Sequence, residues 1–169
     1  MTVSLQKASP DLLDAYFRSF ETDPDLYMDM TLFQPYVYSP QRVSAYSQRI
    51  LSQPDRVNFM VMLGGSPIGE IALKHIDPER STCELSVHLQ NDAVKNRGYG
   101  TQAERLAVRY AFSELGIRTV LADAVLKNAR SQHVLEKVGF VKTGQDDTFY
   151  CYELTSEAFH RADKKTEPA

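Results

Sequence analysis

Two glycines just ahead of an amphipathic run constrain this chain more than any other feature of its sequence. Gly98 and Gly100 follow an apolar, strand-like segment at residues 83–89. The apolar residues of the run recur at helical spacing, at Ala103, Leu106, Ala107 and Tyr110. This spacing predicts a helix over residues 99–115, and Gly116 stands where helices commonly end. A glycine turn at a helix start lets an anion approach backbone N–H groups, although an isolated Gly-x-Gly also serves as a plain turn.

Strands and helices can be predicted along most of the chain. Apolar or alternating runs indicate strands at residues 3–8, 57–63, 67–76, 83–89, 118–126, 140–144 and 149–154. Helices are predicted at about residues 10–20, 41–53, 99–115 and 129–138. Ser9 and Ser39, each followed by proline, provide N-caps for the first two helices, and Gly139 ends the last. The predicted class is therefore α/β, or α+β, with a mixed central sheet of about seven strands flanked by about four helices.

The composition is typical of one soluble globular domain. The chain has 169 residues, of which 43% are hydrophobic and 24% charged. We expect a single domain over residues 1–160 and a polar, frayed tail over 161–169. The formal net charge of −3 argues against a nucleic-acid partner, because such proteins are usually basic. Neither a signal peptide nor an apolar run of membrane-spanning length is recognised, so we expect a cytoplasmic monomer or homodimer without a membrane partner.

The cysteines and most histidines show no spacing typical of a metal site. Cys83 and Cys151 lie in apolar, strand-like stretches without a CxxC motif. They are interpreted as reduced core residues, in neither a disulfide nor a zinc site. His75, His133 and His160 give no metal-ligand spacing either. No metal is therefore expected.

A dinucleotide-binding fingerprint is an alternative interpretation of the glycine turn. Residues 98–103 fit the form G-x-G-x-x-A, and Asp123 closes an apolar strand at the distance of a ribose-binding acid. However, the preceding strand ends near Leu89, which leaves residues 90–97 as a loop. The chain that remains after residue 98 is also too short for two mononucleotide-binding halves. A nicotinamide-binding fold is therefore disfavoured.

The glycine turn and a second segment about thirty residues further on together resemble the GNAT N-acetyltransferase superfamily. The unit KNRGYG, residues 95–100, is similar to its acyl-CoA pyrophosphate loop, Q/R-x-x-G-x-G/A, with Lys95 in place of the usual Gln or Arg. The segment NARSQHVLEKVGF, residues 128–140, is similar to the Asn-x-x-Ser helix of the RimJ/RimL-like branch, related to ribosomal-protein N-terminal acetyltransferases. The resemblance covers residues 57–154 well. It implies the GNAT fold, with the sheet splayed between its fourth and fifth strands.

The resemblance implies acetyl-CoA as the acyl-donor substrate, without a metal. The pantetheine arm would lie in the splay, and the pyrophosphate would meet the N–H groups at the start of the helix at residues 99–115. The cofactor-binding residues predicted in this way are Val87, His88, Leu89, Lys95, Arg97, Gly98, Tyr99, Gly100, Thr101 and Asn128. Other interpretations stay open: Asn128 also suits a plain helix cap, and Lys95 and Arg97 also suit solvent-facing positions.

Acetyl transfer to an amine requires a base, because an alkyl ammonium loses its proton only near pH 10. Glu84 resembles the strand carboxylate of the family and is the predicted base, the alternative being an acid that simply faces solvent. Backbone N–H groups near Val87 are predicted to polarise the thioester carbonyl. His88 is expected to line the cofactor site rather than to act as a base.

The proton for the leaving thiolate has several candidate sources. Many family members use a tyrosine seven residues after the motif asparagine, but that position is Leu135 here. Ser131 shares a helical face with Leu135, and by resemblance its hydroxyl is predicted to bond the thiol and relay a proton from water. The alternatives are a serine bonded to its own helix backbone, or Tyr150 or Tyr152 as the acid.

The long segment at residues 21–38 is the predicted cover of the acceptor site. It contains four acids and four aromatic residues: Glu21, Asp23, Asp25, Asp29, Tyr27, Phe33, Tyr36 and Tyr38. Acids with aromatic rings suit a cation, so the predicted acceptor is a small cationic amine or the N-terminus of a peptide or protein. The alternative interpretation is that the acids of this segment are solvent-exposed and its aromatic residues pack into the core. A non-catalytic acyl-CoA-binding or sensing module is the alternative function.

Overall fold

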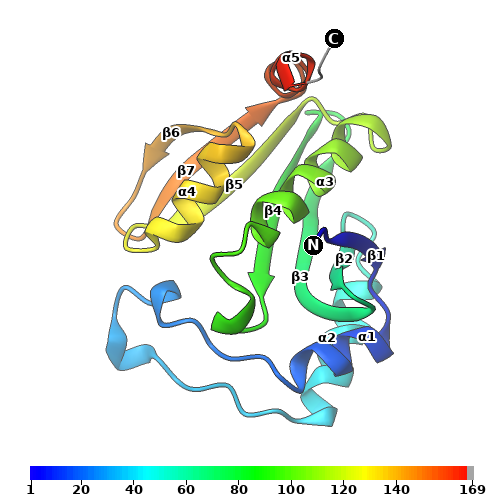
Figure 1. Ribbon diagram of the computed structural model, residues 1–169, viewed down its shortest axis with the longest axis vertical. Coiled ribbons are helices and arrows are strands. Elements are labelled where there is room, and N and C mark those ends of the chain that lie inside the picture. The colour runs from blue at the N-terminus through cyan, green and yellow to red at the C-terminus, as the bar shows by residue number, and fades with distance from the viewer. Residues whose placement is uncertain (167–169) are drawn as a thin grey trace.

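The computed structural model describes residues 1–166, with side chains through residue 163. A seven-stranded sheet in the order β1-β2-β3-β4-β5-β7-β6 carries helices on both faces (Figure 1). The strands are β1 (Ser4–Lys7), β2 (Val57–Leu63), β3 (Ser66–Asp77), β4 (Thr82–Leu89), β5 (Thr119–Val125), β6 (Val141–Gln145) and β7 (Phe149–Thr155). The α-helices are α1 (Pro10–Phe17), α2 (Pro40–Leu51), α3 (Tyr99–Ser113), α4 (Ala129–Val138) and α5 (Ser156–Thr166). The predicted mixed sheet of seven strands is confirmed.

The sheet opens between its fourth and fifth strands. Strands β1 to β4 form an antiparallel meander, and β5, β7 and β6 form a second antiparallel set. Strands β4 and β5 join these sets as a parallel pair, but their register ends at Leu85 and Ala122. Beyond these residues β4 continues to Leu89 and β5 to Val125, so the two strands separate. The predicted splay is therefore confirmed.

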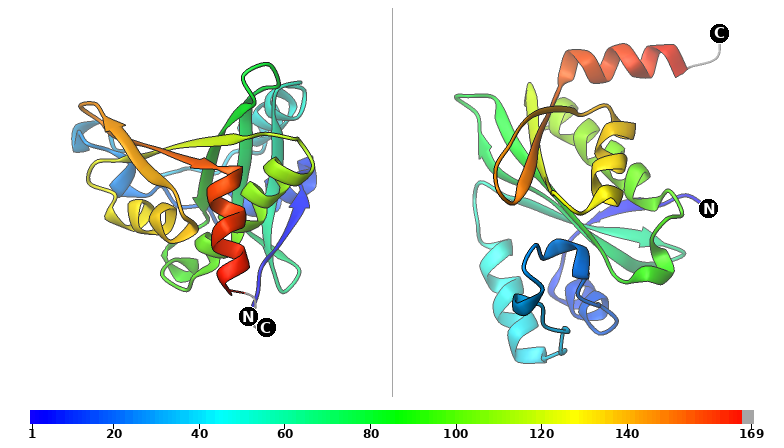
Figure 2. Two further views of the ribbon diagram at one scale, coloured as in Figure 1. Left: turned by 90° about the horizontal axis from the view of Figure 1, so that it is seen from above. Right: turned by 90° about the vertical axis from the view of Figure 1, so that its left-hand side faces the viewer.

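The two faces of the sheet carry different helices, as Figure 2 shows. Helices α3 and α4 cover one face, where their small and apolar residues meet the larger core cluster. Helices α1 and α2 cover the other face over a smaller cluster that includes Met60 and Met62 of β2. Because residues alternate along β4, Cys83 and Leu85 face α3, whereas Glu84 faces the opposite side.

Local sequence signals explain most helix ends. The Ser9 and Ser39 hydroxyls accept from the N–H groups of Leu12 and Arg42, which confirms both predicted caps. The first helix, expected to reach Phe20, stops at Phe17 because the next residues bond in shorter i→i+3 turns.

The C-terminal segment differs from the expectation. Residues 156–166 form α5, so the predicted fraying from residue 161 is wrong for residues 161–166, and residues 167–169 lie outside the described part. Phe159 is buried against Phe112, with ring centroids 5.6 Å apart. Asp163 pairs with Arg109 of α3 at 3.0 Å. An apolar anchor within a charged stretch therefore docks this helix, and the described chain contains five α-helices rather than about four.

Candidate functional site

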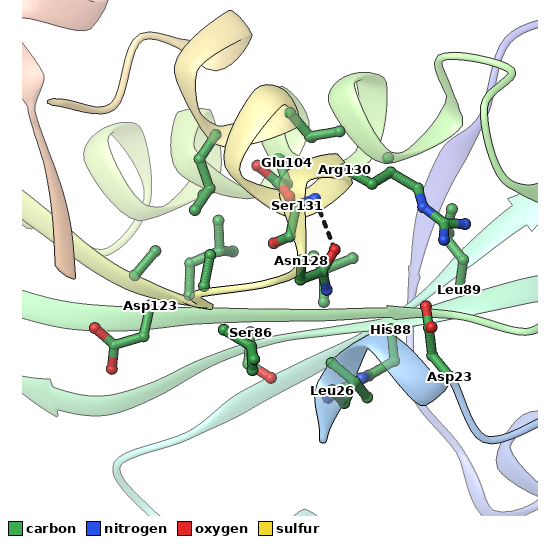
Figure 3. A pocket seen from close by; sticks show the side chains of 18 of the residues that line it. Asp23, Leu26, Ser86, His88, Leu89, Glu104, Asp123, Asn128, Arg130 and Ser131 are labelled. Carbon is green, nitrogen blue, oxygen red and sulfur yellow. Dashed lines mark hydrogen bonds between the residues drawn. The ribbon is translucent and has the colours of Figure 1, made fainter. Parts of the chain in front are cut away.

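A cavity of about 310 Å³ occupies the opening between β4 and β5. It is lined from both faces of the sheet, since Val87 and Leu89 point to the α3 side while Ser86 and His88 point to the α1 side. Figure 3 shows side chains reaching it from both sides of the strands. The cavity therefore connects the two faces through the sheet. Of the predicted site residues, it is lined by Glu84, Val87, His88, Leu89, Lys95, Gly100, Asn128 and Ser131.

The start of α3 presents uncovered backbone N–H groups. Gly98 precedes the helix with φ 78°, in the left-handed region, and no side chain caps the helix. The N–H of Gln102 makes the first helical bond, to Gly98 O at 3.1 Å, so the preceding N–H groups of Tyr99, Gly100 and Thr101 have no helical acceptor. A Cβ added to Gly98 would meet no atom within 4 Å. This turn is thus open to an anion.

The side chains around this turn have different surroundings. Arg97 is exposed, whereas the ring of Tyr99 is buried in the core, so only its backbone is available to a ligand. A Cβ on Gly100 would lie 3.8 Å from Val134 Cγ1 and 3.9 Å from Leu89 Cδ1, which is ordinary contact. Gly100 therefore tolerates a methyl group better than Gly98, whose positive φ strains any side chain.

A group of ion pairs holds the segment at residues 21–38 beside the cavity. Lys95 Nζ lies 2.7 Å from Asp23 Oδ2 and 3.0 Å from Asp92 Oδ1, and its side chain is only 9% exposed. Burial raises the pKa of Asp23, but the hydrogen bond from Lys95 helps to bring that pKa below its usual value. Arg130 on α4 pairs with Asp25 at 3.2 Å. The basic side chain predicted at a phosphate is thus already bound to carboxylates.

The face of β4 opposite α3 carries the predicted base. Glu84 Oε1 accepts a salt bridge from Lys74 Nζ of β3 at 2.8 Å, and about a third of the Glu84 side chain stays exposed. His88 stands four residues further along on the same face. Its ring keeps accessible surface in the cavity, but the surrounding protein lowers its pKa, with a further contribution from Lys74. Glu84 is therefore the carboxylate of β4 that faces the cavity.

The start of α4 supplies two polar groups from the α3 side. Asn128 Oδ1 accepts from the N–H of Ser131 at 3.1 Å, so this buried asparagine caps the helix while it lines the cavity. Among the side chains that the structure describes, the Ser131 hydroxyl has no hydrogen-bond partner. It does not bond its own helix backbone, which was the alternative interpretation.

The rival tyrosines do not line the cavity. Tyr152 is buried in the core, and its hydroxyl lies 3.5 Å from Glu136 Oε1. The ammonium group of Lys142 lies over the ring of Tyr150, with its Nζ 3.4 Å from the ring centroid. Leu135, at the position of the usual tyrosine, is also buried. Ser131 is thus the better placed of the proposed proton donors.

A second cavity, of about 380 Å³, adjoins the first on the α1 side. It shares Phe20, Leu26 and His88 with the first cavity. Its wall is mostly aromatic, formed by Tyr16, Phe17, Phe20, Tyr27, Tyr36 and Tyr46. At its floor Glu70 Oε1 accepts hydrogen bonds from Tyr46 and Asn58, both at 2.7 Å, and burial raises the pKa of this glutamate.

Sequence reasoning did not assign three groups to the predicted acetyltransferase site, although it considered Asp123 for the disfavoured dinucleotide fold. Glu104 of α3 and Asp123 of β5 line the first cavity, and the Tyr16 hydroxyl donates to His88 O at 3.2 Å beside the second. A signal for Glu104 was present, because it lies four residues from both Gly100 and Val108 on the inward face of the helix. Tyr16 and His88 are far apart in sequence, so no local pattern relates them.

No group of three or more His, Cys, Asp or Glu side chains among the described residues is arranged to hold a metal ion. No helix in the described part of the chain is long and apolar enough to cross a membrane.

Comparison with known proteins places the chain among acetyltransferases. Residues 3–141 match the model of the acetyltransferase (GNAT) domain. In Bacillus subtilis (strain 168), "Probable N-acetyltransferase YjcK" is 30% identical over 106 residues, 62% of this chain and 58% of that protein. "Putative ribosomal N-acetyltransferase YdaF", from the same organism, is 29% identical over 85 residues, 50% of this chain and 46% of that protein. The match therefore spans about half the length of these curated relatives.

The fold recurs in solved structures of low sequence identity. The aminoglycoside acetyltransferase AAC(6')-Ib, in a complex that contains acetyl-CoA, superposes on the chain with a TM-score of 0.76. The alignment covers 100% of both chains at 19% identity. At this identity the likeness concerns the fold alone.

Proposed function

We propose that this chain, which belongs to the GNAT acetyltransferase family, transfers the acetyl group of acetyl-CoA to a primary amine by direct attack in a ternary complex. The observation that carries the proposal is the cavity through the splayed sheet. One side of it meets the uncovered N-terminus of α3, and the other side meets the carboxylate of Glu84. A donor entering from the first side presents its thioester to an amine on the second.

The proposed donor site uses backbone groups more than side chains. The pyrophosphate of acetyl-CoA lies against the N–H groups at residues 98–101, where the helix dipole favours negative charge. The pantetheine arm lies between the parts of β4 and β5 that do not pair with each other, and its amides bond these strand edges. Asn128, Val87 and Leu89 line the part of the cavity proposed for the arm. Lys95 contributes to phosphate binding by releasing one of its two carboxylate partners.

The proposed transfer needs one base and one proton donor. Glu84 takes a proton from the acceptor ammonium, directly or through a water, and the resulting amine attacks the acetyl carbonyl carbon. A C–N bond forms, the C–S bond breaks, and the electron pair leaves with sulfur. As the amide forms, the nitrogen releases its second proton to water. Ser131 relays a proton from water to the thiolate, because the pKa of a serine hydroxyl is far above that of a thiol and the hydroxyl does not itself ionise. The products are the N-acetyl amine and coenzyme A.

The proposed acceptor is a small cationic amine or a peptide N-terminus. Asp23 and Asp25 are engaged by Lys95 and Arg130, and Asp29 caps its own turn by accepting from Thr31, so these acids support the loop rather than the acceptor. The aromatic wall of the second cavity, which shares Phe20, Leu26 and His88 with the first, instead suits the remainder of the acceptor. This assignment moves the predicted specificity from the acids of the loop to the aromatic wall of the second cavity, to which the loop contributes Tyr27 and Tyr36.

Release of thiol from acetyl-CoA tests the proposal directly. The protein is mixed with acetyl-CoA and a panel of polyamines, aminoglycosides, amino acids and peptides, and free thiol is measured with each. We expect release that depends on an amine of the panel. Binding of acetyl-CoA by calorimetry without release for any amine would indicate the non-catalytic sensing module instead.

Gly98→Val is expected to weaken acetyl-CoA binding at least tenfold, about 1.4 kcal/mol. The side chain would fill the open space before the helix N-terminus and force the turn away from φ 78°. Gly116→Val is the matched control, because Gly116 also has positive φ and open space but lies at the other end of α3. Calorimetry should show reduced affinity for the first variant only. Equal losses would indicate general destabilisation.

Ser131→Ala is expected to lower kcat ten- to a hundredfold, the usual range for an acid–base group, with little change in acetyl-CoA affinity. Ser113→Ala serves as the control, since that exposed serine bonds the backbone of Arg109 in α3. Steady-state kinetics and calorimetry give the two readouts. Normal turnover in Ser131→Ala, together with a large loss in Tyr150→Phe, would move the role to the tyrosine.

A further inference from the structure

Glu104 has a buried carboxyl group that lines the cavity but has no role in the proposed transfer. It lies one turn into α3, its relative exposure is 1%, and it lines the first cavity. Its Oε2 atom has no hydrogen-bond partner among the described residues. Figure 3 shows its carboxyl group on the helix side of the strands, the side from which Asn128 and Ser131 also reach the cavity. An unpartnered polar atom thus borders the space proposed for the donor.

An unpartnered carboxyl group in this position is costly. A buried polar group without a hydrogen bond costs about 1–3 kcal/mol, and a charged one costs more. The neighbours of Glu104 on the inward face of α3 are Gly100, Val108 and Ala111, so an apolar side chain would suit the helix packing. Helix packing therefore gives no reason for an acid here, whereas a ligand in the cavity does.

We propose that Glu104 is a specificity residue of the donor site, whose carboxyl group donates its O–H to a carbonyl oxygen of the amide-bearing arm of acetyl-CoA. The inference rests on the proposed function, because it takes the cavity as the site of that arm. The thioester end approaches Glu84 on the other face of the sheet, and Glu104 holds the arm on the helix side. No bond other than this hydrogen bond forms or breaks.

The protonation state of Glu104 agrees with a donor role. Burial raises the pKa of its carboxyl group to about 8, so the group carries its proton at neutral pH. No charged neighbour contributes to this shift. The other titratable groups that line the same cavity are Glu21, Asp23, Lys74, Glu84, His88, Lys95, Asp123 and Arg130. The effect of Glu104 ionisation on acetyl-CoA affinity must therefore be separated from the effects of these other groups. Comparison with a variant that lacks the Glu104 carboxyl group does this.

The test measures acetyl-CoA affinity by calorimetry between pH 6 and 9.5 for the wild-type protein and for Glu104→Leu and Glu104→Gln. Adenosine 3′,5′-bisphosphate, which lacks the arm, is the second probe. We expect Glu104→Leu to bind acetyl-CoA about tenfold more weakly at pH 7 and with a flatter pH profile. The wild-type advantage should disappear above pH 8, when the carboxyl group loses its proton. Glu104→Gln, which retains an N–H donor, should recover part of the affinity.

The second probe separates contact with the arm from a general structural effect. All three proteins should bind adenosine 3′,5′-bisphosphate equally, since this probe has no arm for Glu104 to contact. Equal acetyl-CoA affinity of wild type and Glu104→Leu throughout the pH range would overturn the inference and leave the proposed function intact. A loss of both probes in Glu104→Leu would also overturn it, as damage to the fold. Absence of acetyl-CoA binding to the wild-type protein would reject the proposed function itself.

Discussion

Glu84→Gln is expected to lower kcat by about a hundredfold or more, because proton transfer by a positioned carboxylate contributes about 10²–10⁴ to a rate. The amide keeps the size of the side chain but cannot take a proton from the acceptor ammonium. Lys74, now 2.8 Å from the carboxylate, would lose its partner but remains close to solvent, with 27% of its side chain exposed. The affinity for acetyl-CoA should change little, since Glu84 lies on the acceptor face.

Glu79→Gln provides the control for this experiment, because Glu79 is exposed in the turn between β3 and β4. Its kcat should equal that of the wild-type protein. The kinetics are followed over pH, since a base lost at residue 84 should leave a residual rate that rises with pH as the amine deprotonates in solution. If Glu84→Gln turned over at the wild-type rate, the base would have to be sought elsewhere on this face, with His88 the next group to test.

Glu104→Leu is expected to stabilise the protein by about 3 kcal/mol at pH 7, even though it weakens the donor site. In the unfolded chain the carboxyl group ionises near its ordinary pKa of 4.5, whereas burial raises the pKa to about 8 in the folded protein. The folded state therefore holds a proton that the unfolded state releases. Folding loses stability as pH rises from 4.5 to 8, and the loss levels off above 8.

The stability difference between Glu104→Leu and wild type should follow this window. Below pH 4.5 both states carry the protonated acid, so the ionisation contribution vanishes. It then grows by about 1.4 kcal/mol per pH unit until the folded carboxyl group ionises as well. Urea unfolding at several pH values measures it, with Glu114→Leu as the control on an exposed glutamate at the end of the same helix. A difference that is constant from pH 4 to 9 would contradict the raised pKa.

Local signals were sufficient for most of the fold. The caps at Ser9 and Ser39 were predicted because a serine followed by proline satisfies a helix start with neighbouring atoms alone. The helix after Gly98 and the meander were predicted from periodicity, which depends on residues a few positions apart. Helix α5 was missed because its docking depends on Phe159 meeting Phe112 of α3, a contact that no local pattern encodes.

The candidate site likewise contains groups that local sequence suggests and contacts that only the tertiary structure shows. Gly98, Asn128 and Ser131 could be chosen as candidates from the sequence because a turn, a cap and a helical face are properties of short segments. The partners of Lys95 were not predicted, since its carboxylate Asp23 lies 72 residues away in the chain. Accordingly, we propose that the loop acids support the loop rather than bind the acceptor.

By itself, the sequence determined the order of the strands and of helices α1 to α4, the glycine turn at the start of α3 and the identity of the groups on each strand face. These depend on dihedral preferences, caps and alternation, which act between near neighbours. Only the tertiary structure decided that the sheet opens beyond Leu85, that two cavities meet at His88, and that the carboxyl group of Glu104 is enclosed without a partner. Burial and charge pairing depend on which distant segments come together, and that is decided by the packing of the whole chain.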